Sequence, residues 1–315
     1  MSNKALREVF GEALVELGAR NPDVVVLDAD LSSATRSILF GNEFPERFFN
    51  VGITEANMVS MGVGFSTCGL IPYVCTFSFL LTLRATDQIR SHISYPANNV
   101  KLMGTNGGLS GFGDGATHQS IMDLAVLRAM PNMTILVPSD EHQMRWAVDA
   151  VSRFNGPAFI RVPRVEAPNI HPEDTSYEIG KGMVLRKGSD VTIISMGMML
   201  CRALEAADSL ADQGISAEVL EIQTLKPLDK DLIITSAQKT GAVITAEEHS
   251  RYGGLFSAVT EVLAAECPVH SDCVAIEDRF AGSGQYDELL ELCGLTAGNI
   301  VNKATEVFKK KTGKK

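Results

Sequence analysis

Apolar residues along the first half of the chain fall into two spacings. Apolar positions three and four residues apart are typical of helices that pack on a core. This spacing predicts helices over Lys4–Gly18, Thr54–Thr67, Thr82–Ser94, His118–Met130 and Ser139–Val151. Short continuous apolar runs are typical of buried strands, and they predict strands over Val24–Leu27, Phe44–Val51, Ile71–Cys75, Val100–Met103, Thr134–Val137 and Pro157–Arg161. Because strands and helices alternate, we expect a parallel, doubly wound sheet.

The second half shows a similar alternation over a shorter length. It predicts strands over Val191–Ser195, Ala217–Glu221, Ala242–Glu247 and Val274–Ile276, and helices over Met199–Gln213 and Asp229–Gln238. We expect a loop over Glu248–Gly254, before a further helix. Residues 166–188 carry proline, glycine and charge without periodicity, which predicts a linker. The fold class expected is therefore α/β with two doubly wound domains, a mainly parallel one over 1–165 and a smaller one over 189–315.

Helix starts carry residues that can accept hydrogen bonds from free backbone amides. We expect the hydroxyls of Thr54 and Ser139 to cap their helices in this way. Glu55 follows Thr54 directly, and a carboxylate in a first helical turn is electrostatically favourable. Taken alone, Glu55 is therefore explained as part of a helix start.

Composition narrows the classes of partner. The 315 residues include 28 Lys and Arg against 38 Asp and Glu, a net charge of −10, which argues against nucleic acid and anionic membranes as partners. The six cysteines have no metal-ligand spacing, and with no secretory signal they predict a reduced, cytoplasmic protein. No apolar run reaches the ~20 residues of a membrane span. The basic segment Lys309–Lys315 is expected to be a solvated end.

Polar and aromatic residues follow several predicted strands of the first half. Asp28–Ser33, Phe77 and the glycine-rich stretch Gly104–His118 each come just after a strand. Ligands of open parallel sheets bind beyond the carboxyl ends of the strands. We therefore expect these three segments to contribute to one site.

Four motifs carry a resemblance to a known family. They are GITEAN (52–57), RATDQIR (84–90) after the dipeptide TF (76–77), GDGATHQ (113–119) and LRAMPNMTILVPSD (127–140). In their order and spacing they resemble the pyrimidine-binding domain of the transketolase family of thiamine diphosphate enzymes. The second half, with GSDVTIISMGMML and AEEHSRYGGLF, resembles the C-terminal domain of that family.

Complete transketolases carry a preceding domain whose GDG…N motif holds the diphosphate through a divalent metal. The GDG at 113–115 lacks the asparagine about thirty residues further on, so we expect no metal site in this chain. The resemblance implies the C-terminal subunit of a split transketolase. A separate N-terminal subunit would hold the diphosphate and Mg²⁺, within a heterotetramer that also contains a homodimeric contact.

The resemblance assigns cofactor-binding roles to four residues. Glu55 matches the glutamate that hydrogen-bonds a ring nitrogen of the cofactor's aminopyrimidine, and this contact would activate the cofactor. Phe77 matches the aromatic that stacks on that ring. Phe79 and Leu80 lie where the family often has a second aromatic. The alternative for each apolar residue is an ordinary place in the core.

The resemblance also assigns substrate-binding roles. Asp114 and His118 match residues that face sugar hydroxyls, with His118 placed for proton transfer at the carbonyl oxygen. Arg7 and Arg164 match arginines that reach the distal phosphate. The family's phosphate-contacting serine falls at or near Ala34, beside Ser33, and a family histidine falls at Asn106. The anion end is thus altered, and the substrate could be a ketose phosphate or an unusual one, either a branched sugar phosphate or a sulfonated ketose.

The reaction implied is transfer of a two-carbon ketol unit from a ketose to an aldose. Two other thiamine diphosphate enzymes remain possible: the β subunit of a 2-oxoacid dehydrogenase decarboxylase component, and a fragment related to deoxyxylulose phosphate synthase. A non-catalytic scaffold on the same fold is a third alternative. The sequence does not name the donor or the acceptor sugar.

Overall fold

The computed structural model describes residues 4–313, which form two compact units. The first unit contains the residues up to Gly111 and Thr117–Tyr177. The second contains Phe112–Ala116 and the residues from Glu178 onward. Each unit is an α/β layer structure, so the expected fold class is confirmed, whereas the domain limits 1–165 and 189–315 stay a prediction.

The first unit is built on a parallel sheet. Its strands lie in the order β6 (Thr134–Leu136), β7 (Ala158–Val162), β5 (Lys101–Thr105), β4 (Ile71–Phe77), β2 (Val24–Asp28) and β3 (Phe48–Asn50). The chain adds β3 on one side of β2 and β4 on the other. The edge between β2 and β4 is therefore a topological switch point, where such sheets form ligand sites.

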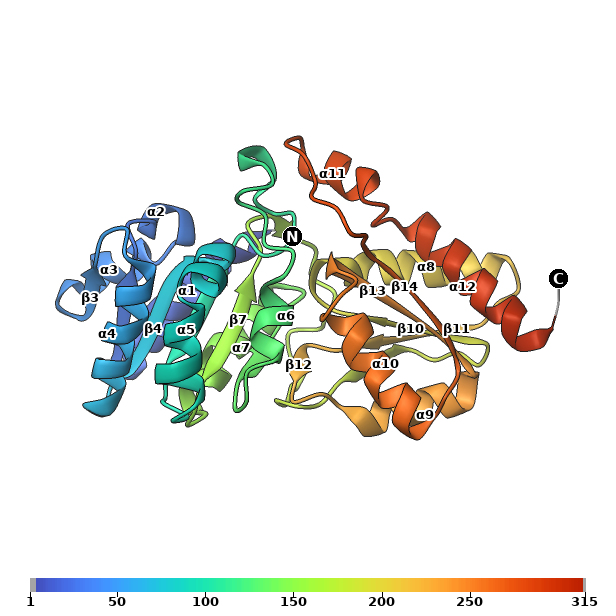
Figure 1. Cartoon of the computed structure of the whole chain (residues 1–315), viewed down its shortest axis with the longest axis horizontal. Helices are drawn as coiled ribbons and strands as arrows, with labels where there is room; N and C mark the ends of the chain where they lie inside the picture. The colour runs from blue at the N-terminus through green and yellow to red at the C-terminus, as the bar shows by residue number, and fades with distance from the viewer. Residues whose placement is uncertain (1–3, 314–315) are drawn as a thin grey trace. The chain divides into compact units, whose positions relative to one another are not determined.

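Helices cover both faces of this sheet (Figure 1). On one face α1 (Leu6–Arg20) packs against α3 (Ile38–Glu43) and α7 (Glu141–Arg153). On the other lie α4 (Glu55–Thr67), α5 (Thr86–Gln88) and α6 (Asp123–Arg128). The remaining elements are α2 (Ser32–Thr35), the π-helical turns Leu80–Arg84 and Ile89–Ser94, the 3-10 turns Pro45–Arg47 and Phe112–Asp114, and the antiparallel pair β1 (Lys4–Ala5) and β8 (Glu166–Ala167).

The second unit has a sheet with one antiparallel edge. Its strands follow the order β14 (His270–Ile276), β13 (Ala242–Ser250), β10 (Val191–Ser195), β11 (Ala217–Glu221) and β9 (Met183–Arg186), and only β9 is antiparallel to its neighbour. Helices α8 (Leu200–Asp212) and α12 (Ala297–Thr312) pack on one face, and α9 (Lys230–Thr240) and α10 (Leu255–Glu266) on the other. The unit also contains β12 (Thr224–Lys226), α11 (Tyr286–Leu292) and the 3-10 turn Gly197–Met199.

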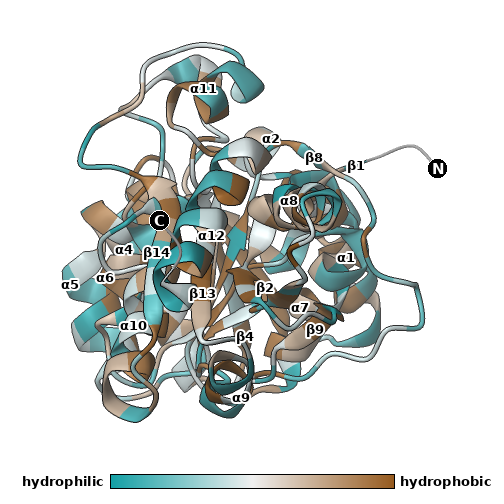
Figure 2. Ribbon diagram, turned by 90° about the vertical axis from the view of Figure 1, so that its right-hand side faces the viewer, coloured by the Kyte–Doolittle hydropathy of each residue, from teal (hydrophilic) through white to brown (hydrophobic). Residues whose placement is uncertain are grey.

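Burial explains why the strands could be recognised from their sequence. All five residues of β2 and all five of β10 are buried, as expected for parallel strands with helices on both faces. In Figure 2 the helices α1 and α12 show both teal and brown segments, which fits helices with one face on a sheet.

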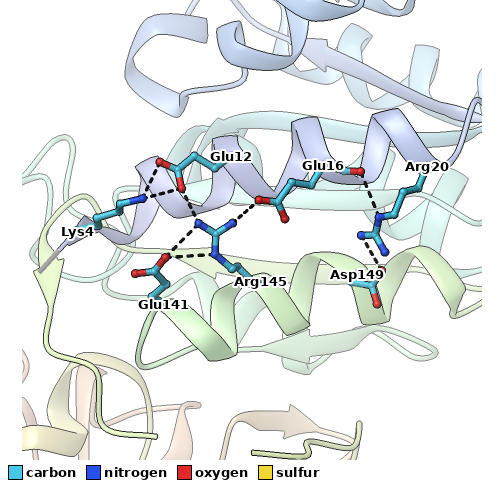
Figure 3. Close-up of polar contacts among 7 residues, drawn as sticks. All are labelled: Lys4, Glu12, Glu16, Arg20, Glu141, Arg145 and Asp149. Atoms are coloured by element: carbon cyan, nitrogen blue, oxygen red, sulfur yellow. Dashed lines mark hydrogen bonds and ion pairs between the residues drawn. The ribbon is translucent and has the colours of Figure 1, made fainter. Parts of the chain in front are cut away.

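A polar network joins α1 to α7 across the surface of the first unit (Figure 3). The Arg145 guanidinium contacts the carboxylates of Glu12 at 2.5 Å and Glu16 at 2.9 Å, both on α1. Glu141, one turn before Arg145, adds a contact of 3.1 Å. Single exposed pairs contribute little to stability, but a network around one arginine holds a fixed geometry. The network therefore fixes the register of the two helices.

Several expected boundaries are wrong, and each has a local cause. The helix expected from His118 begins only at Asp123, because Ser120 pairs with the backbone of Gly108. The helix expected over 82–94 is divided into π-helical and α-helical turns. The loop expected from Glu248 is wrong for its first residues, because β13 continues to Ser250.

The expected helix caps also need correction, and two further segments contain regular structure. Asp140, not Ser139, caps α7, and Thr54 donates its hydroxyl to the Val51 carbonyl instead of accepting a hydrogen bond. The expected linker 166–188 contains β8 and β9. The segment expected to be a solvated end is exposed over residues 309–313, as expected, and it is helical through Thr312; residues 314–315 lie outside the described part of the chain.

Candidate active site

A cavity of about 310 Å³ lies at the switch point of the first unit. The loops that follow β2 and β4 form its walls together with the start of α4. Its lining consists of Ala29, Asp30, Leu31, Ile53, Glu55, Phe77, Phe79, Leu80, Arg84, Thr117 and His118. All four expected cofactor-binding residues and the expected catalytic histidine are thus brought together in one cavity.

Glu55 is the first residue of α4 and is only 4% exposed. Its position at a helix N-terminus favours a carboxylate. Nη1 of Arg84 donates to both carboxylate oxygens, at 3.1 Å to Oε1 and 3.4 Å to Oε2. The Arg84 side chain is 57% exposed, so this partner reaches Glu55 from the solvent side.

Arg84 is a site residue that the sequence interpretation missed. It ends the π-helical turn Leu80–Arg84, and such turns are frequent at functional sites. The RATDQIR motif, which begins at Arg84, was the available signal. The motif supports the resemblance, but it does not show that its arginine reaches a carboxylate 29 residues earlier.

Two phenylalanines and a histidine form the aromatic wall of the cavity. Phe77 is the last residue of β4, and Phe79 precedes the π-helical turn. The His118 ring meets both edge-on, with ring centroids 6.2 Å from Phe77 and 5.2 Å from Phe79. The Thr117 hydroxyl lies 3.0 Å from Nδ1 of His118. This wall offers apolar area for a flat ring, with one titratable group beside it.

Arg7 lies among positive charges, outside the lining of the cavity. Its Nη1 donates to the Ala34 carbonyl at 3.3 Å. Burial, followed by the nearby Arg164 and Arg36 guanidinium groups, lowers the pKa of Arg7. Arg36 is paired with Glu8 at 2.6 Å. The two expected anion-binding arginines therefore share one electropositive neighbourhood, to which Arg36 adds a charge that the sequence interpretation missed.

Ser33 lies on the short helix α2, in a loop that Asp28 holds in place. The Asp28 carboxylate accepts hydrogen bonds from the Leu31 amide at 2.6 Å and from the hydroxyls of Thr35 and Ser37, both at 2.8 Å. Burial raises the pKa of Asp28. Asp28 thereby shapes the loop that carries Ser33 and the cavity residues Ala29–Leu31.

Asn106 and Asp114 occupy two different settings. Asn106 follows β5 with a φ of 58° and is 1% exposed, and neither polar atom of its side chain finds a hydrogen-bond partner within residues 4–313. Asp114 lies in the 3-10 turn Phe112–Asp114, which belongs to the second unit. The residues that line the cavity of the first unit do not include Asp114.

Residues 4–313 contain no group of three or more His, Cys, Asp or Glu side chains that could hold a metal ion. None of the helices in that range is both long enough and apolar enough to cross a membrane.

Both halves of the chain match transketolase domains. Residues 2–169 match the transketolase pyrimidine-binding domain, and residues 180–300 match the transketolase C-terminal domain. The chain is 40% identical to a transketolase C-terminal section of Methanocaldococcus jannaschii, over 98% of this chain and 97% of that one. It is also 40% identical to the 6-deoxy-6-sulfo-D-fructose transketolase subunit SqwH of a Clostridium species, over 97% and 95%. The chain belongs to the transketolase family.

A solved structure points to the same part of that family. A split-gene transketolase, described as an inactive beta4 tetramer, matches with a TM-score of 0.90 and 44% identity, over 98% of this chain and 100% of that one. Relatives that match along their whole length are thus C-terminal sections or subunits. The chain is the C-terminal subunit of a split transketolase, a thiamine diphosphate-dependent transferase, and the expected enzyme class is confirmed.

The cavity fits one end of thiamine diphosphate. A flat, partly polar ring needs an apolar wall and a hydrogen-bonding group at its edge. Phe77, Phe79 and Leu80 provide the wall, and the buried Glu55 carboxylate provides the hydrogen-bonding group. A diphosphate carries several negative charges, and the only cationic side chain in the lining is Arg84. The donor set therefore suits the pyrimidine end of the cofactor.

Proposed function

We propose that this chain forms the pyrimidine side of a transketolase site that moves a two-carbon ketol unit from an anionic ketose to an aldose. The observation that carries the proposal is the convergence of Glu55, Phe77 and His118 in one cavity at the sheet's switch point. When bound, thiamine diphosphate supplies an electron sink for breaking and forming the carbon–carbon bond.

In this proposal each site residue has a separate role. Glu55 holds a proton at the edge of the pyrimidine ring, which activates the cofactor. Phe77, Phe79 and Leu80 pack against the face of the ring and exclude water from it. His118 gives or takes a proton at the carbonyl oxygen of the donor sugar. Asp114 accepts hydrogen bonds from the hydroxyls of the sugar.

The anion end of the donor is assigned to the electropositive group around Arg7. Arg7 and Arg164 bind the distal phosphate or sulfonate, and Ser33 adds a hydroxyl donor. Asn106 carries a buried amide without a partner in the described chain, and such a group is costly unless a ligand or water satisfies it. A sulfonated ketose is a candidate because the Clostridium relative is named for 6-deoxy-6-sulfo-D-fructose.

A separate N-terminal subunit completes the site in this proposal. That subunit holds the diphosphate and Mg²⁺, as the resemblance to split transketolases implies. We infer a heterotetramer with two copies of each chain and two sites, so that neither chain alone is active. The six cysteines, present as thiols, fit a reducing cytoplasm, and the net charge of −10 fits the expectation that nucleic acid and membranes are not partners.

The test uses the complex reconstituted with its N-terminal subunit, thiamine diphosphate and Mg²⁺. We expect Glu55→Gln to lower kcat by at least ~10²-fold while the melting temperature stays close to that of the wild type. Glu16→Gln, on the exposed side of α1, is the matched control and should keep full turnover. Turnover of Glu55→Gln within about threefold of the wild type would contradict the proposal.

The same complex separates the alternative functions. Two-carbon transfer from a sugar supports the transketolase reaction, whereas CO2 release from a 2-oxo acid would favour the dehydrogenase or synthase alternatives. Isothermal titration of thiamine diphosphate and Mg²⁺ into the complex addresses the scaffold alternative. No binding in that titration would favour the scaffold.

A further inference from the structure

A buried ion pair contacts two segments that carry lining residues of the cavity without taking part in the lining itself. Asp123 and Arg161 have side chains that are 0% and 5% exposed. Nε and Nη2 of Arg161 donate to the two carboxylate oxygens of Asp123, at 2.8 and 2.9 Å. This fork geometry is the most directional kind of ion pair. Because buried pairs are often no more stabilising than apolar side chains of the same size, stability alone does not explain the pair.

Each partner of the pair also holds one wall of the cavity. Oδ2 of Asp123 accepts a hydrogen bond of 2.7 Å from the hydroxyl of Ser78, which lies between Phe77 and Phe79. Nη2 of Arg161 donates to the Ser120 carbonyl at 2.6 Å, two residues after His118. The pair therefore links the backbone that carries the phenylalanines to the backbone that carries the histidine.

The Arg161 side chain also shapes the loop that ends in His118. Ser120 exchanges two backbone hydrogen bonds with Gly108, of 2.8 and 2.9 Å, which close the loop. A Cβ added to Gly107 would lie 2.6 Å from Cγ and 2.8 Å from Nε of Arg161, so the arginine packs directly against the loop backbone. Shortening or turning this side chain would leave the closed loop without its support.

We propose that Asp123 and Arg161 are positioning residues that set the place of His118 relative to Phe77 and Phe79. The pair occupies neighbouring elements, since Arg161 lies on β7 and Asp123 begins α6. The hydrogen bonds of the pair to each other, to Ser78 and to Ser120 define the distance between the two walls without either residue touching the substrate. The expected effect on turnover rests on the proposed role of His118, whereas the effect on the loop does not.

The test compares Arg161→Lys with Ser78→Ala in the reconstituted complex. Lysine keeps the charge but loses the fork and the simultaneous reach to Asp123 and Ser120. We expect kcat with xylulose 5-phosphate or 6-deoxy-6-sulfo-D-fructose to fall by ~10–100-fold for Arg161→Lys, since small misplacements of a reacting group have effects of this size. Ser78→Ala should lower kcat by a smaller factor. Because this variant keeps the ion pair between Asp123 and Arg161, we expect it to fold. In both variants the Kd for thiamine diphosphate should stay within about twofold of the wild-type value, because Glu55 keeps its position on α4.

Amide hydrogen exchange provides a readout that does not depend on activity. We expect faster exchange over residues 106–120 in Arg161→Lys, with unchanged exchange in α12. Val307→Ala, in the buried face of α12, is the control for a general loss of stability. Equal kcat and equal loop exchange in Arg161→Lys and Val307→Ala would overturn the positioning role. If His118→Ala itself kept full turnover, the proposed role of His118 would fail, while the exchange experiment would still decide the positioning role.

Discussion

At the scale of single residues, the contact between Arg84 and Glu55 has a direct consequence for cofactor binding. Arg84 occupies both oxygens of the carboxylate that the pyrimidine ring would use. Because the arginine is largely exposed, its contact contributes only ~0.2–1 kcal/mol. We expect Arg84→Met to tighten thiamine diphosphate binding by about two- to fivefold, measured by isothermal titration of the complex. Arg90→Met, in the second π-helical turn, is the control. An unchanged or weaker affinity of Arg84→Met would show that the arginine does not compete with the cofactor.

Glu55, Phe77 and His118 could be predicted because short local motifs carry them. Arg84 could not be assigned, because its contact depends on a π-helical turn, and a pattern with a period of 3.6 residues does not reveal such a turn. The ion pair of Asp123 and Arg161 was missed for a related reason. Its residues are 38 positions apart, and only the parallel pairing of β5 with β7 brings Arg161 under the loop that precedes Asp123.

At the scale of elements, the start of α7 shows how tertiary contacts determine which residue caps a helix. Ser139 is the cap expected from the sequence, and the neighbouring Asp140 caps the helix instead. The carboxylate of Asp140 accepts from the Gln143 amide at 2.9 Å and also from the amides of Ile170 and His171, at 3.0 and 2.9 Å. It further contacts Nδ1 of His171 at 2.7 Å. The partners at 170 and 171 lie outside any local pattern, so only the structure selects Asp140.

These contacts predict a pH-dependent contribution of Asp140 to stability. Burial alone would raise its pKa, but the hydrogen bonds from His171 and Gln143 prevail and hold the pKa below its usual value. The stabilisation is therefore present at pH 7 and is lost as the pH falls below ~4 towards the lowered pKa. We expect Asp140→Ala to lose ~2–4 kcal/mol at pH 7 and less at pH 3, measured by urea unfolding.

Ser139→Ala is the matched control for this element. Its hydroxyl donates a hydrogen bond of 3.1 Å to Oε1 of the Gln143 side chain. We expect its cost to stay below ~1.5 kcal/mol at both pH values. A larger loss for Ser139→Ala than for Asp140→Ala would restore the serine as the cap.

At the scale of the whole molecule, α4 and its surroundings are more apolar than a free surface requires. The helix sequence EANMVSMGVGFST has apolar residues all around, which is typical of a helix covered on every side. Next to the cavity, Ile53 and Leu83 are 71% and 48% exposed. Exposed apolar side chains beside a site that holds only one end of the cofactor indicate a surface that a partner covers. In the proposed function that partner is the N-terminal subunit.

This surface gives a test of assembly that does not rely on chemistry. We expect Ile53→Asp to prevent the chain from joining the N-terminal subunit, because a carboxylate buried at an interface without a partner costs several kcal/mol, of order ~3–5. Light scattering after size exclusion would then show the chain without its partner, whereas the wild type would form a complex with two 33.9 kDa copies of this chain. Leu292→Asp, at a residue that is 58% exposed on α11 of the second unit, should assemble normally. Failure of both variants would point to misfolding, which circular dichroism would reveal. Normal assembly and cofactor binding by Ile53→Asp would exclude this side of the cavity from the interface and would require the partner to approach the cofactor from another direction.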